Sequence, residues 1–278
     1  MNKISWISNF LKRRKAAAAV GDDAAFYTYE SRAPSAQNAI DAIKGWNSTF
    51  PSEFGVVAGT AVPFGDDRIQ WAMNRYGDFT GKRVLELGPL EGAHTFMFDR
   101  AGAEVTAVEA NRSAFLKCLI TKEIVGLPRS SFLLGDFMPW LELKETRWDF
   151  VVACGVLYHM RDPLRLLEAI AARTDAIFLW THYVEENGPD SPVGSNHAYD
   201  AVRETRSFHG ETLTVYRHPY LGADLNPEFC GGVYENPRWM ARESIVRALE
   251  ILGFTSLEFA HDTRDHPNGP CFSILARR

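Results

Sequence analysis

The chain has 278 residues, of which 46% are apolar, and this predicts one α/β domain with an added segment and excludes a largely disordered chain. Its formal net charge of −5 argues against a large nucleic-acid partner, because such domains usually need a positive surface to neutralise phosphates. Its cysteines, Cys118, Cys154, Cys230 and Cys271, form no CxxC pair, which gives no sign of a zinc site or a disulfide framework and fits a cytoplasmic protein.

The first 60 residues show weak periodicity, and we expect them to form a variable leader. Basic residues run from Lys12 to Lys15 and follow a short, mixed apolar stretch, whereas a secretory signal peptide has its charges first. A small amphipathic surface helix is the predicted structure there. No apolar run approaches the roughly 20 residues that a membrane helix needs, so we expect no membrane partner.

A strand–helix alternation follows this leader. Residues 64–76 are predicted to be helical, with Ile69, Trp71, Ala72 and Tyr76 as candidate buried positions. The predicted strands are 83–87, 104–108, 131–134, 150–153 and 176–180, and the predicted helices are 93–100, 111–125 and 163–172. Helices between successive strands imply a doubly wound parallel sheet, whose ligands bind at the carboxyl ends of the strands.

The alternation stops at about residue 182. Residues 187–196 are rich in Gly, Pro, Ser and Asn and predict a loop, and the stretch 182–240 is rich in aromatic residues and histidine. We expect this stretch to be a substrate cap inserted after the fifth strand of a domain that spans 61–278. A helix at 241–252 and strands at 254–259 and 271–275 predict a closing antiparallel hairpin.

The first strand runs into a glycine-containing turn and then a helix. Gly88, followed by Pro89, allows the backbone to approach a ligand, and Gly92 permits a tight start of the helix. The turn lacks the GxGxxG pattern of dinucleotide sites. Glu86, two positions before the first glycine, would repel a pyrophosphate but suits the ammonium group of S-adenosylmethionine (SAM). A purely structural glycine turn is the alternative interpretation.

Acidic residues also follow the second and third strands. Glu109, followed by Ala110, can accept hydrogen bonds from both hydroxyls of a ribose, since an ionised carboxylate only accepts. Asp136 can accept from the adenine amine, and Phe137 can flank the ring. The alternatives are a solvated acid at a strand end and an Asp that caps a turn. Three such features after three successive strands favour a nucleoside site.

The fourth strand delivers Cys154 and Gly155, and then Tyr158 and His159, to the same edge of the sheet. A histidine there can serve as a general base, because its ordinary pKa is near 6.5. The alternative is a packed histidine that bonds to the backbone. His182, at the start of the cap, is a further catalytic candidate. The histidines lack metal-ligand spacing, so we expect no metal.

These motifs resemble those of the class I SAM-dependent methyltransferases. The matching stretches are VLELGPLEG (84–92), AVEAN (107–111), GDF (135–137) and WDFVVACGVLYHMRDPL (148–164). The resemblance implies a seven-stranded, mostly parallel Rossmann-like sheet with an antiparallel last strand, and SAM as the cofactor.

The resemblance also implies places for the parts of the cofactor. Glu86 and Gly88 would border the methionine, Glu109 would hold the ribose and Asp136 the adenine end. Gly155 and Val156 would lie beneath the sulfonium. Leu90 stands where the family has the middle glycine of its first motif.

The stretch GVLYHMRDPL is also similar to one in the tRNA wobble-uridine carboxymethyltransferase group. We expect methyl transfer to an oxygen or nitrogen of a small-molecule acceptor, held among the aromatic residues of the cap. A tRNA-modifying methyl or carboxymethyl transferase and a non-catalytic SAM-binding module are the alternatives.

Overall fold

The computed structural model describes residues 28–186, 202–220, 230–234 and 236–278. The strands are β1 (Arg83–Leu87), β2 (Glu104–Glu109), β3 (Ser130–Leu134), β4 (Phe150–Cys154), β5 (Ala176–His182), β6 (Arg203–Phe208), β7 (Glu211–Arg217), β8 (Arg238–Met240), β9 (Ser256–Thr263) and β10 (Cys271–Arg277). The α-helices are α2 (Ala36–Ala42), α3 (Asp67–Tyr76), α4 (Ala93–Arg100), α5 (Arg112–Val125), α6 (Phe137–Leu143), α7 (Pro163–Ala171) and α8 (Arg242–Ile251). Short 3-10 helices are η2 (Ser52–Phe54), η3 (Pro63–Gly65) and η4 (Leu157–His159).

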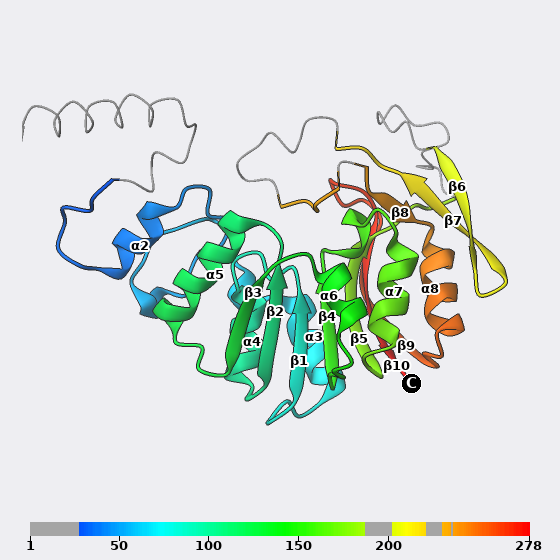
Figure 1. The fold of residues 1–278 in the computed structure, drawn as a ribbon, viewed down its shortest axis with the longest axis horizontal. Coiled ribbons are helices and arrows are strands. Elements are labelled where there is room, and N and C mark those ends of the chain that lie inside the picture. The colour runs from blue at the N-terminus through cyan, green and yellow to red at the C-terminus, as the bar shows by residue number, and fades with distance from the viewer. Residues whose placement is uncertain (1–27, 187–201, 221–229, 235) are drawn as a thin grey trace, which may run out of the picture.

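Seven strands form the central sheet in the order β3-β2-β1-β4-β5-β10-β9 (Figure 1). Strands β1 to β5 pair in parallel, and β10 pairs antiparallel with both β5 and β9. The predicted doubly wound sheet and its closing hairpin are therefore confirmed. The strand order reverses between β1 and β4, and ligands of such sheets bind at this switch point.

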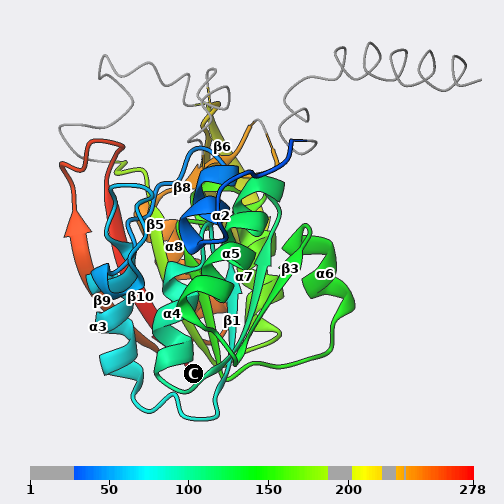
Figure 2. The same cartoon turned by 90° about the vertical axis from the view of Figure 1, so that its left-hand side faces the viewer.

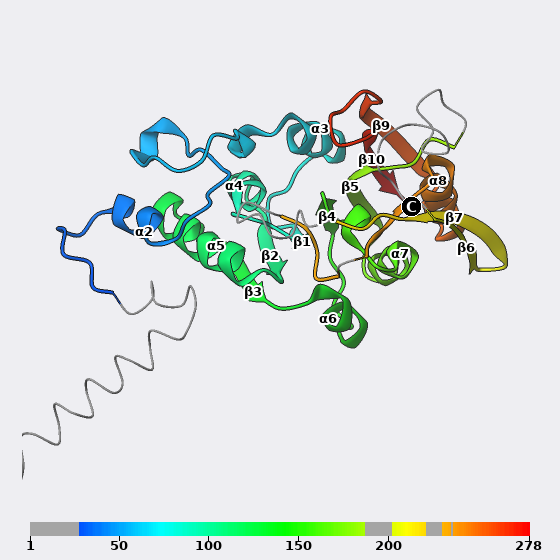
Figure 3. The ribbon, with the colours of Figure 1, turned by 90° about the horizontal axis from the view of Figure 1, so that it is seen from above.

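Helices cover both faces of the sheet (Figure 3). Val84 and Phe150 pack on one face with Phe98 of α4, whereas their neighbours along the strands, Leu85 and Val151, pack on the other face with residues of α7 and α8. Strand side chains alternate between faces, so an unbroken apolar run such as that of β4 requires two covering layers. Val84, Leu85 and Leu87 give β1 the same two apolar faces. This explains why apolar runs alone sufficed to predict these strands.

The cap region contains a second sheet with the order β6-β7-β8, which the sequence interpretation missed. Strands β6 and β7 form a hairpin whose two loop residues, His209 and Gly210, have φ values of 49° and 87°. Positive φ at both positions is typical of a type I′ turn, and His-Gly between alternating segments is the signal that could have predicted it. The loop predicted at 187–196 lies outside the described residues. Among the described helices, none is long and apolar enough to cross a membrane.

The part of the predicted leader that the structure describes packs against the domain. Helix α2 lies beside α5 (Figure 2), and Ile40 joins an apolar cluster with Cys118 and Val125 of α5. Farther along, the carboxylate of Glu91 accepts hydrogen bonds from the backbone N–H groups of Asn47 and Ser48 at 2.9 and 2.6 Å. Lys117 Nζ lies 3.0 Å from the same carboxylate. The segment from 45 to 61 is thus fixed over the turn that follows β1.

Gly59 is the tightest point of this segment, and replacing it should loosen the segment. A Cβ at Gly59 would lie 2.1 Å from the carbonyl oxygen of Asn47. We expect Gly59→Ala to lower the free energy of unfolding by about 1–3 kcal/mol, as overpacking does, measured by urea denaturation. Gly65→Ala is the matched control, because a Cβ there meets nothing within 4 Å. Equal midpoints for the two variants would contradict this packing.

Candidate active site

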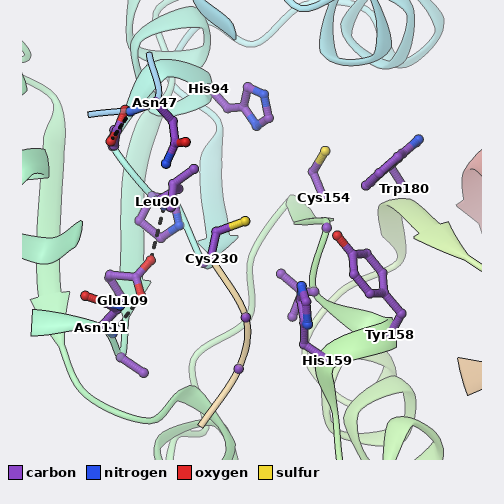
Figure 4. A pocket seen from close by; sticks show the side chains of 18 of the residues that line it. Asn47, Leu90, His94, Glu109, Asn111, Cys154, Tyr158, His159, Trp180 and Cys230 are labelled. Carbon is purple, nitrogen blue, oxygen red and sulfur yellow. Dashed lines mark hydrogen bonds between the residues drawn. The ribbon is translucent and has the colours of Figure 1, made fainter. Parts of the chain in front are cut away.

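A cavity of about 830 Å³ lies at the carboxyl ends of the central strands. Its walls come from the N-terminal segment, from the turns after β1 to β4, from Trp180 of β5, from Asn268 and from residues 230–234 (Figure 4). The predicted site residues that line it are Gly88, Pro89, Glu109, Ala110, Asp136, Phe137, Cys154, Gly155, Tyr158 and His159. Glu86, Gly92 and His182 are not among the residues that line it.

Glu109 ends β2 and is fastened to two turns. Its Oε2 accepts a hydrogen bond from the N–H of Leu90 at 3.1 Å, and its Oε1 accepts one from the N–H of Asn111 at 2.7 Å (Figure 4). The residue is 8% exposed, and burial raises the pKa of its carboxyl against the opposing effect of the backbone N–H donors. Each carboxylate oxygen keeps a further lone pair, so the group can still accept from a vicinal diol.

Leu90 holds a backbone conformation that favours glycine. Its φ is 55°, in the left-handed region, which costs a residue with a Cβ roughly 1–2 kcal/mol. The bond from its N–H to Glu109 helps to hold this conformation. The turn therefore holds a conformation that glycine adopts readily, with an added side chain that lines the cavity.

Glu86 lies beneath the cavity wall and is 1% exposed. The hydroxyl of Thr95 donates to its Oε2, and Nδ1 of His94 lies 4.0 Å from its Oε1. Burial raises the pKa of Glu86, and the nearby His94 opposes this shift. Because His94 lines the cavity and Glu86 does not, contact of Glu86 with a ligand ammonium stays a prediction. Gly92 has a φ of 81° and packs under the ring of Phe132, which fits its expected place at the helix start.

Arg68, in the first turn of α3, was missed by the sequence interpretation and lines the cavity. Its guanidinium donates to both carboxylate oxygens of Asp66 and lies 4.3 Å from the centroid of the Trp180 ring. Asp66 also lies 3.0 Å from Nε2 of His94. Burial works against ionisation of Asp66, yet its hydrogen bonds to His94 and Arg68 hold the pKa of this carboxyl well below its usual range. Asp66 caps α3, and the capping pattern at 66–68 is the signal that could have drawn attention to this pair.

Asp136 caps a helix, which was one of the two interpretations made from the sequence, and it also lines the cavity, so contact with adenine stays a prediction. Its Oδ1 accepts from the N–H of Met138 at 2.9 Å and so caps α6, a helix that was not predicted. Its Oδ2 lies 3.4 Å from the hydroxyl of Tyr234, and the residue lines the cavity. Capping therefore uses one oxygen and leaves the other beside the cavity.

His159 lies in η4, directly after β4, and is held by a tyrosine. Its Nδ1 lies 2.8 Å from the hydroxyl oxygen of Tyr220, which accepts a hydrogen bond from the N–H of Gly232 at 3.0 Å. Burial lowers the pKa of His159 to about 3, so the ring is neutral near pH 7. A Cβ at Gly232 would lie 2.8 Å from the carbonyl oxygen of His159, so only glycine lets this segment come so close.

Tyr158 lies in the wall of the cavity, and His182 lies behind Tyr158. Tyr158 lines the cavity, and its ring centroid lies 4.7 Å from that of His182. His182 is 3% exposed, its Nδ1 lies 2.8 Å from the carbonyl oxygen of Gly269, and its ring stacks on Trp239. The structure thus brings Tyr158 and His159 to the cavity but keeps His182 one layer away, and a catalytic role for His182 stays a prediction.

The family model of a methyltransferase domain matches residues 66–210. The chain belongs to this methyltransferase family. Its central sheet has the strand arrangement of the class I SAM-dependent methyltransferases. None of the curated proteins matches the methyltransferase.

Among solved structures, the methyltransferase is similar to the N-terminal domain of EvdMO1. One crystal structure of that domain was obtained in the presence of S-adenosylhomocysteine (SAH) and D-fucose. Its sequence is 26% identical to this chain, with a TM-score of 0.63, and the match covers 87% of this chain and 94% of that chain. A second, with SAH bound, is 25% identical, with a TM-score of 0.64. The structure of EvdMO1 itself is 24% identical, with a TM-score of 0.55, and the methyltransferase covers 46% of that chain. The methyltransferase therefore spans about half the length of EvdMO1.

The ion pairs of Asp66 should contribute to the stability of the methyltransferase. We expect Asp66→Asn to lower the free energy of unfolding by about 1–3 kcal/mol at pH 7, because the partly buried guanidinium of Arg68 loses its charged partner. The lowered pKa of Asp66 means that this contribution is complete above the ordinary carboxyl pKa of about 3.9 and is lost as the pH falls below it.

Urea denaturation at pH 7 and at about pH 3.5 measures both effects. Asp67→Asn, at the exposed neighbouring position, is the control and should change the stability by a few tenths of a kcal/mol. A stability difference between Asp66→Asn and the parent that persists unchanged at the lower pH would contradict the assignment.

Proposed function

We propose that the methyltransferase binds SAM in this cavity and transfers its methyl group to an oxygen or nitrogen of a small-molecule acceptor. The observation that carries the proposal is Glu109, a buried carboxylate at the tip of β2 that lines the cavity and keeps acceptor capacity. The SAH-bound domain of EvdMO1 supports the same cofactor. The presence of D-fucose in the other structure of that domain favours a hydroxyl-bearing acceptor.

The residues along the sheet edge match the parts of SAM in order. Asp136 and Phe137 follow β3 and would border the adenine, and Glu109 follows β2 and would bind the ribose hydroxyls. Near the turn after β1, Arg68 offers a cation for the carboxylate of the methionine moiety, and Glu86, buried behind His94, would attract its ammonium. The sulfonium then falls between the turn after β1 and the turn after β4, near Tyr158 and His159.

Replacing the ribose ligand should weaken cofactor binding. We expect Glu109→Gln to lower the affinity for SAH at least tenfold, about 1.4 kcal/mol, because the amide replaces one acceptor oxygen with a donor. Isothermal titration calorimetry measures this. Glu104→Gln is the matched control, since Glu104 is exposed at the opposite end of β2. If both variants bind SAH as tightly as the parent, the cofactor does not lie as proposed.

Methyl transfer from a sulfonium is an in-line displacement, and alignment of the acceptor supplies much of the rate. A hydroxyl acceptor also needs a base to take its proton. We assign this role to His159. The oxygen of Tyr220 has two lone pairs and can accept from Gly232 N–H and from Nδ1–H of His159 together, which leaves Nε2 free to take the proton. Tyr220 is then a positioning residue, which acts through His159.

Loss of the base should slow methyl transfer without releasing the cofactor. We expect His159→Asn to lower kcat by about 10²- to 10⁴-fold with a hydroxyl acceptor and to change the SAH affinity less than threefold. The rate of SAH formation from SAM is measured with a panel of hydroxyl- and amine-bearing small molecules that begins with D-fucose. His209→Asn, in the exposed turn of the β6–β7 hairpin, is the control. Cofactor binding with no turnover across the whole panel would favour the non-catalytic module instead.

We also propose that residues 61–278 form the SAM-binding domain, with 182–240 as its substrate cap. The cap supplies Cys230 to Tyr234 to the cavity wall, and the N-terminal segment adds Asn47 and Ser48. The unpaired cysteines support the cytoplasm as the location. Kinship with the tRNA-modifying group stays a prediction.

A further inference from the structure

Three side chains from distant parts of the sequence meet behind the cavity. His182 ends β5, Cys271 begins β10, and His266 lies in the loop between β9 and β10. One potential ligand atom from each residue lies within 4.8 Å of the others. Strands β5 and β10 pair so that Cys271 stands directly opposite His182, and opposite residues of an antiparallel pair project from the same face. The register of the sheet therefore builds two of the three positions.

The chemistry of this set is that of a metal site. Imidazole nitrogens and a thiolate are ligands that Zn²⁺ and similar borderline-soft ions prefer, whereas Mg²⁺ and Ca²⁺ prefer oxygen. Three protein ligands leave one tetrahedral position for water. Sequence spacing could not reveal the set, because the strand pairing and the loop bring it together.

The surrounding groups orient these side chains as the outer shell of a metal site does. Nδ1 of His182 faces the carbonyl oxygens of Gly269 and Pro270 at 2.8 and 3.3 Å, which makes it the protonated nitrogen and leaves a lone pair on Nε2. The Trp239 ring stacks on His182 at a centroid distance of 5.0 Å and fixes its plane.

We propose that His182, His266 and Cys271 bind one Zn²⁺-class ion that pins the β9–β10 loop to the end of β5. Binding releases the thiol proton of Cys271 to solvent. Asn268 N–H donates to Nδ1 of His266 at 3.2 Å, so ligation at Nε2 moves the ring proton to Nδ1 and breaks that bond.

The ion lies behind the reaction site and is not part of it. The rings of Tyr158 and Trp180 line the cavity, and their centroids lie 4.7 and 5.0 Å from that of His182. Asn268 belongs to the pinned loop and lines the cavity as well. The ion therefore sets the position of one wall of the cavity, and we expect it to stabilise the protein without supplying catalytic chemistry.

The test uses the full chain, freed of metal, with Zn²⁺ or Co²⁺ alone as the probe. We expect one equivalent of Zn²⁺ to bind and to raise Tm, and Co²⁺ to give the intense visible bands of a tetrahedral site together with a thiolate charge-transfer band. Cys271→Ser should remove the charge-transfer band, and His266→Ala should lower the Zn²⁺ affinity at least tenfold. His209→Ala is the control and should bind as the parent does.

Two ligand variants, Cys271→Ser and His266→Ala, are used so that a folding defect in one of them does not leave the proposed metal site untested. Cys271 is buried, so its replacement could disturb folding, whereas His266 lies in a partly exposed loop. Circular dichroism and SAH binding check that each variant is folded. No stoichiometric binding by the parent, or a charge-transfer band that survives in Cys271→Ser, would overturn the proposal. Because the readouts need no SAM, their failure leaves the proposed function untouched.

Discussion

The cavity depends on one buried carboxylate that joins two turns. Glu109 accepts from the N–H of Leu90 after β1 and from the N–H of Asn111 after β2, so the loops after β1 and β2 cannot separate without breaking a charge-assisted bond. These bonds offset the cost of burying the charge, and they hold Leu90 in its left-handed conformation. A side chain that would bind the cofactor thus also shapes the turn on which the cofactor would lie.

The two ends of the cavity differ in their electrostatics. Around the turn after β1, Arg68, Asp66, His94 and Glu86 form a chain of charged and titratable groups, which suits a zwitterionic amino acid. Near β4, burial keeps His159 neutral. A neutral imidazole can accept a proton, but the same burial makes it a weaker base than a histidine with an ordinary pKa, so the site depends more on alignment of the acceptor with water excluded. The division supports cofactor binding at one end and methyl transfer at the other.

Elements built on local patterns could be predicted from the sequence, and elements built on tertiary contacts could not. Short apolar runs revealed β1 and β4, and acids near strand ends, such as Glu109 and Asp136, reach the cavity. Arg68 reaches the cavity, and Tyr220 reaches His159, because distant segments fold together, and no local pattern encodes these contacts. His182 follows the same strand-end rule as Glu109, yet β10 and the ring of Tyr158 cover it.

The stretch that matches the family model, 66–210, is shorter than the unit that makes the cavity. A fragment trimmed to it would lose Asn47 and Ser48, the partners of Glu91, and the wall at 230–234. It would also lose β9 and β10 and so leave β5 as an open sheet edge, which invites aggregation. Fragments for crystallisation or engineering should therefore retain both flanks.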